Sequence, residues 1–199
     1  MIKRTKRKSK QPDEFKLFKE LGKYVDGVGR TELKKGVLFS SCVRASFVKC
    51  YEFNLLAWDE KNLKSAFFWL PTLRGICEDL IVLNFVQSIP KKEREQFIGD
   101  LMQYETHDRS KTQEAFFDRA RPHQPYLRSP ISKKQLTSLE DRVRHVWRTY
   151  GWSNINKNIR PPTRQIAEKH GGEILATLYD YLYRLTSESV HFNVRGLFV

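Results

Sequence analysis

The sequence contains little cysteine, which excludes two classes of small protein. The chain has an odd number of cysteines, Cys42, Cys50 and Cys77, and no two of them form a CxxC pair. This pattern predicts neither a disulfide framework nor a zinc site. Because disulfides are rare in reducing compartments, the cysteine usage indicates a protein of the cytoplasm.

Long apolar segments are also missing. No run of 18 apolar residues occurs, and the most apolar stretch, residues 65–89, is interrupted by Arg74, Glu78 and Asp79. The sequence therefore predicts no membrane span and no membrane partner. The basic start is followed by "PDEFKLFKE", where a secretory signal would carry its apolar core, so we expect no signal peptide.

The common catalytic and cofactor motifs do not occur. The five histidines are His107, His123, His145, His170 and His191. They include no HxH or HxxxH pair, and the chain has no P-loop, GxGxxG or GxSxG sequence. We therefore expect neither a metal nor an organic cofactor.

Acidic residues are too few to balance the basic ones. The 199-residue chain has 36 Lys and Arg against 23 Asp and Glu, which gives a net charge of +13. Such an excess favours nucleic acid or another polyanion as a partner. Six basic residues lie in the first ten positions: Lys3, Arg4, Lys6, Arg7, Lys8 and Lys10. We predict a flexible basic arm over residues 1–12, which either contacts phosphates or serves solubility, and one α-helical domain over residues 13–199.

The apolar residues repeat at helical spacing, and no alternating pattern bounded by hairpin turns occurs. Helices are predicted over residues 13–25, 31–58, 62–87, 90–118, 132–150, 163–170 and 173–191. Thr31 and Thr163 are the expected N-caps, and Pro71 should kink its helix or mark its restart. Loops are expected over 119–130 and 151–162 because of their prolines and glycines. This pattern predicts an all-α bundle of long helices with short helical inserts.

The helix predicted over 62–87 carries a charged pair inside an apolar stripe. At about 100° per residue, Arg74 and Glu78 share a face with Phe67, Ile81 and Phe85. Unpaired buried charge is costly, so these two side chains must pair with each other or with another helix. One alternative is a structural ion pair, and the other is a polar cluster that orients a site.

The last predicted helix provides a polar ridge that could meet this pair. The ridge consists of Asp180, Arg184, Ser187 and His191, with Glu188 beside it and Tyr183 to one side. Each member also has an ordinary explanation. Asp180 and Arg184 are a favourable surface pair, the Ser187 hydroxyl can bond to backbone, and His191 suits a helix C-terminus.

The chemistry of the ridge suits RNA. A histidine transfers protons near neutral pH, and an arginine binds phosphate and stabilises charge during phosphoryl transfer. The ribose 2′-OH can serve as an internal nucleophile, so no metal is required. Ser187 with His191 could also form a hydrolase pair, but no nucleophile elbow accompanies them.

Arg184, followed by six residues and then His191, resembles the Arg-x(4–6)-His motif of HEPN domains. The chain is also similar, over about residues 39–197, to a HEPN-like bacterial family catalogued as a domain of unknown function. That family has Arg-x-x-x-Glu on an early apolar helix, here "RGICE" with Arg74 and Glu78, and a Tyr-rich helix that ends in Ser-x-x-x-His. The sequence departs from the ribonuclease members at Leu185, where those commonly have a polar residue.

The resemblance implies an all-α, HEPN-like fold and a metal-independent endoribonuclease of a bacterial phage-defence or toxin system. It also implies a homodimer in which two motifs face each other, and a regulatory partner protein is possible in such a system. Arg184 would be the phosphate clamp and His191 the general acid and base. The supporting residues would be Arg74, Glu78, Asp180, Tyr183, Ser187 and Glu188.

One alternative stays open. In a non-catalytic helical module, the same cluster would be structural and the basic surface would bind nucleic acid or protein. A second Arg/His pair, Arg164 and His170, also has the motif spacing, but these residues lie about 120° apart on a helix and do not share a face.

Overall fold

The computed structural model describes residues 13–28, 36–58, 66–120, 131–153, 155 and 159–186. Within these ranges every regular element is a helix and none is a strand, which confirms the predicted all-α class. The predicted basic arm, with its six Lys and Arg residues, lies outside the described residues. No described helix is both long enough and apolar enough to cross a membrane.

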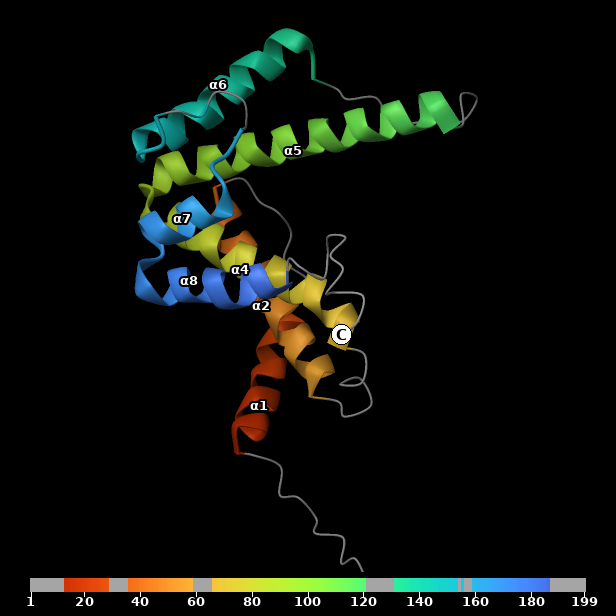
Figure 1. Cartoon of the computed structure of the whole chain (residues 1–199), viewed down its shortest axis with the longest axis vertical. Coiled ribbons are helices and arrows are strands. Elements are labelled where there is room, and N and C mark those ends of the chain that lie inside the picture. Colours follow the sequence, from red (N-terminus) through yellow and green to blue (C-terminus); the bar gives the residue numbers. More distant parts are fainter. Residues whose placement is uncertain are drawn as a thin grey trace, which may run out of the picture.

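The helices pack as a bundle from which a pair of helices extends at one end (Figure 1). Their bounds are α1 Asp13–Val28, α2 Leu38–Ala57, α4 Ala66–Ser88, α5 Lys91–Ala120, α6 Lys133–Thr149, α7 Thr163–His170 and α8 Gly172–Leu178. α5 and α6 lie side by side at the top of the view, and α1 packs on α2 at the opposite end. α4 contacts α2 on one side and α7 on the other. The most apolar helix is therefore the central one, as predicted.

Aromatic rings form the centre of the core. Phe85 of α4 is fully buried and stacks on Trp147 of α6, with ring centroids 4.4 Å apart. Phe97 of α5 and Trp152, which follows α6, contact the Phe85 ring edge-on. This packing joins α4, α5 and α6 into one core, because each helix contributes a large ring to one contact set.

The start of α2 differs from the prediction. Gly36 has a φ of +87° and Val37 is not helical, so the helix begins at Leu38 rather than near Thr31, which lies outside the described residues. Val37 provides no side-chain cap. Instead, the carboxylate of Glu95 on α5 accepts hydrogen bonds from the backbone N–H groups of Leu38 (2.6 Å) and Phe39 (3.3 Å). The cap therefore comes from another helix.

Other boundaries were predicted well, with two corrections. Ser132 and Gln135 form a capping box at the start of α6. Pro71 lies inside one continuous α4, so the helix does not restart there. Thr163 is the first residue of α7 rather than its cap, and Pro162 holds the cap position. The Thr163 hydroxyl is directed to Glu78 instead.

The last helix contains a feature that the sequence did not predict. α8 starts at Gly172, whose φ of +60° separates it from α7, and continues into a π-helical turn, η1, over Tyr179–Tyr183. The N–H of Arg184 donates to the carbonyl of Tyr179, five residues earlier. Such turns are often found at functional sites. The relative directions of side chains that were assigned for a regular α-helix therefore do not apply across this turn.

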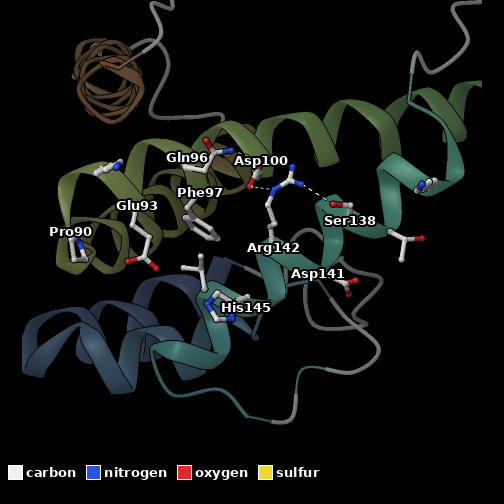
Figure 2. Close-up of a pocket in the computed structure, with 13 residues that line it drawn as sticks. Pro90, Glu93, Gln96, Phe97, Asp100, Ser138, Asp141, Arg142 and His145 are labelled. Carbon is white, nitrogen blue, oxygen red and sulfur yellow. Dashed lines mark hydrogen bonds and ion pairs between the residues drawn. The ribbon is translucent and has the colours of Figure 1, made fainter.

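An ion pair links α5 and α6, the two helices that extend from the bundle. The carboxylate of Asp100 on α5 is buried and accepts two hydrogen bonds from the Arg142 guanidinium of α6, each 2.8 Å long. Arg142 also donates to the Ser138 hydroxyl (Figure 2). Phe97 and Val146 lie in the same hollow between the helices, which has a volume of about 1140 Å³. The paired and satisfied carboxylate explains how a charge is tolerated here.

Candidate functional site

Arg74 contacts the last helix, which is one of the two alternatives left open by the sequence. Its Nη2 donates to the hydroxyl of Tyr183 in η1 at 3.1 Å, and its guanidinium carbon lies 5.0 Å from the centroid of that ring. Tyr183 stacks in turn on Tyr179, at 4.8 Å between centroids and 20° between planes. The guanidinium and two phenol rings thus form a continuous stack between α4 and the π-helical turn.

Glu78 does not pair with Arg74. Among the described residues its carboxylate forms an ion pair with Arg160 and accepts a hydrogen bond from the Thr163 hydroxyl at 3.4 Å. The alternative in which Arg74 and Glu78 neutralise each other is therefore wrong. Each one binds a different part of the chain, and Glu78 holds the start of α7 against α4.

Arg184, the proposed phosphate clamp, lies next to this stack but faces solvent. Its side chain is 66% exposed, and its described ion pair is with Asp180, at 3.8 Å on the same helix. An exposed pair of this length contributes little stability. The ordinary reading of Asp180 and Arg184 as a surface pair thus fits the geometry, and it leaves the guanidinium accessible to a phosphate group.

A further arginine acts on the same tyrosine as Arg184. Burial and the neighbouring Tyr183 raise the pKa of Tyr179, while the positive charges of Arg164 and Arg184 oppose that rise. Both guanidinium groups therefore act on the same phenol. Arg164 is itself exposed and pairs with Glu168. The sequence did not predict that Arg164 and Arg184 act on the same phenol, because Arg164 belongs to α7. It also did not predict Arg160 as the partner of Glu78, because the two residues are 82 positions apart.

The pair of Arg164 and His170 does not form a site. The His170 ring packs against Phe85 and Trp152, with centroids 5.1 and 5.0 Å apart, and its Nε2 lies 3.4 Å from the Tyr150 carbonyl oxygen. His170 is therefore part of the aromatic core.

The remaining predicted residues of the ridge, Ser187, Glu188 and His191, lie outside the described residues. Their roles stay predictions. Within the described ranges, no group of three or more His, Cys, Asp and Glu side chains is arranged to hold a metal ion.

The Arg74–Tyr183 contact predicts a specific loss on mutation. Tyr183→Phe keeps the ring stack but removes the hydroxyl that accepts from a charged donor, so we expect the free energy of unfolding to fall by about 1–2 kcal/mol. Urea denaturation measures this change. Tyr181→Phe is the matched control, because Tyr181 is 69% exposed, and we expect it to change stability by less than about 0.5 kcal/mol. Equal effects of the two substitutions would contradict the described contact.

Comparison with known proteins gives one match. The model of a family described as a family of unknown function, DUF5677, matches residues 37–199, a range that starts directly before α2 and includes the whole candidate cluster. Neither the curated proteins nor the solved structures contain a match.

Proposed function

The chain belongs to the DUF5677 family, and we propose that it is a HEPN-like, metal-independent endoribonuclease of a bacterial defence or toxin system that acts in the cytoplasm. Arg184 binds the scissile phosphate, and His191 transfers the protons. One observation carries the proposal. Arg74, from the "RGICE" motif on α4, binds Tyr183 directly beside the exposed Arg184, so both motif-bearing helices meet at the proposed site.

The chemistry needs only groups of the protein and of RNA. His191 accepts the proton of a ribose 2′-OH while the 2′ oxygen attacks the adjacent phosphorus. The bond to the 5′ oxygen breaks, and that oxygen takes up the proton that His191 holds as an imidazolium, which returns the histidine to its neutral form. The products are a 2′,3′-cyclic phosphate and a 5′ hydroxyl. Arg184 stabilises the negative charge that develops on the phosphoryl oxygens.

RNA binding is supported by charge and by exposed rings. The chain has a net charge of +13, and the charges of Arg164 and Arg184 both act on Tyr179. Tyr181 in η1 is 69% exposed, so its ring is open to stacking with an unpaired base. Basic side chains beside exposed aromatic rings favour single-stranded nucleic acid.

A homodimer is part of the proposal because the helix of Arg184 exposes apolar side chains. Ile174 and Leu185 are 81% and 54% exposed. Large exposed apolar side chains can form part of an interaction site. A second copy that covers them would place two Arg184 side chains near one another.

The alternative is a non-catalytic module that binds nucleic acid or a regulatory protein. It is favoured by the ring stack of Arg74, Tyr183 and Tyr179, which also makes sense as a structural contact between α4 and η1. In such a module, RNA affinity would weaken with salt and would not depend on His191.

The test is RNA cleavage in the presence of a chelator. We expect the protein to release cyclic phosphate ends, and Arg184→Ala to slow cleavage by about 100-fold because a group that stabilises the transition state is lost. Arg184→Lys should retain part of the activity, since it keeps the charge but loses bidentate contact.

The matched control is Arg109→Ala, which removes an exposed arginine from α5 and should leave the cleavage rate unchanged. If the parent protein cuts no RNA, or if Arg184→Ala and Arg109→Ala cut equally well, the proposed function is wrong.

A further inference from the structure

A second hollow lies on α4 and is lined in part by Glu78, but the lining described contains neither Arg184 nor His191. It lies between α2, α4 and α5 and has a volume of about 500 Å³, which is within the range typical of small-molecule sites. Apolar side chains from α4 and α5 form much of its lining, among them Val82, Val86, Ile98, Leu101 and Met102. A few charged groups face the same space.

The charges in this pocket do not balance. Lys49 pairs with Asp79 at 2.8 Å, and Arg160 pairs with Glu78, so both cations are already neutralised by carboxylates of α4. Glu105 of α5 also lines the pocket and has no ion-pair partner among the described residues. The lining therefore carries one carboxylate in excess.

The pKa of the Cys42 thiol is consistent with this excess of negative charge. Cys42 lines the pocket from α2, and its pKa is raised first by burial and then by the negative charges of Glu95, Asp79 and Glu105. Three carboxylates thus act on one point of the pocket wall. A lining with one carboxylate in excess favours a cation over an anion as its ligand.

We propose that this pocket binds an organic cation that has an apolar stem, such as an arylalkylamine or the side chain of a lysine between apolar residues. The stem packs on Val82, Leu101 and Met102, and the ammonium group lies against Glu105. Burial of the stem provides affinity, and the carboxylate selects the charge. Binding here is independent of RNA cleavage, because neither Arg184 nor His191 belongs to the lining described.

Titration calorimetry on the full chain tests the proposal with three ligands of one shape. We expect phenethylamine to bind saturably, and phenethyl alcohol to bind about tenfold more weakly, since it lacks the charge-assisted contact. Hydrocinnamate, which carries a negative charge, should not bind. A blocked leucyl-lysyl-leucine peptide measures the other source of the same chemistry. If it binds more tightly than phenethylamine, the natural ligand is a protein segment, and if more weakly, a small amine.

Three variants locate the binding. Glu105→Gln should weaken phenethylamine binding about tenfold, whereas Asp108→Asn, an exposed carboxylate on the same helix but outside the pocket lining, should not. Ala45→Trp, at an exposed lining position, should abolish binding by filling the pocket, while thermal unfolding checks its fold. Absence of saturable amine binding, equal affinity for the alcohol, or equal effects of Glu105→Gln and Asp108→Asn would each overturn the proposal. RNA cleavage would be unaffected by any of these results.

Discussion

His191→Ala is expected to reduce RNA cleavage by a factor of about 10²–10⁴, which is the usual contribution of one general acid or base. The alanine side chain cannot accept the 2′-OH proton, so attack on phosphorus must rely on water. RNA affinity should change little, because Arg184 and the basic surface remain. Single-turnover cleavage with chelator present separates the rate of the chemical step from binding.

The control is His145→Ala, since His145 is an exposed histidine on α6, far along the chain from the proposed site. We expect it to cleave like the parent protein. The double variant of Arg184→Ala and His191→Ala should cleave little more slowly than His191→Ala alone, because residues that act as a unit are not additive. A His191→Ala variant that retains full activity would show that His191 is not the general acid or base.

Phe85→Ala should lower the free energy of unfolding by about 3–5 kcal/mol, the range for truncating a buried aromatic residue. Phe85 is fully buried and contacts five rings, those of Phe97, Trp147, Tyr150, Trp152 and His170. Five rings around one position cannot collapse into the space left by a phenyl group without losing their own contacts. Urea denaturation followed by circular dichroism measures the change.

Phe116→Ala is the matched control, because Phe116 is a phenylalanine on α5 that is 57% exposed. We expect its effect to be below about 1 kcal/mol. If the two substitutions destabilised the protein equally, Phe85 would not be the centre of the core. A change in tryptophan fluorescence is expected for Phe85→Ala alone, since its ring stacks on Trp147.

The parts of the fold that local sequence determines were predicted from sequence. The capping box of Ser132 and Gln135 fixes the start of α6 through contacts three residues apart. The start of α2 could not be predicted in this way, because Glu95 reaches it from 57 positions away. The π-helical turn at Tyr179–Tyr183 has no local signal either, since its residues also fit an ordinary α-helix.

The same distinction applies to the candidate site. Because burying unpaired charge is costly, Arg74 and Glu78 were predicted to need partners. The tyrosines of the last helix were anticipated as one source of such partners, and Arg74 does contact Tyr183. The other partner, Arg160, lies in a loop whose position depends on the packing of α7. Periodicity contains no information about such a contact. The positions of Ser187 and His191 remain a prediction.

The cap that Glu95 provides has a consequence for how the chain can change over evolution. Because a residue of α5 accepts from the first two N–H groups of α2, the part of the chain shared with the family caps its own first helix and needs no cap from the residues before it. The segment before Gly36 can therefore be replaced, by recombination or by an engineered fusion, without loss of this cap. We expect relatives to diverge most in length and composition before this glycine.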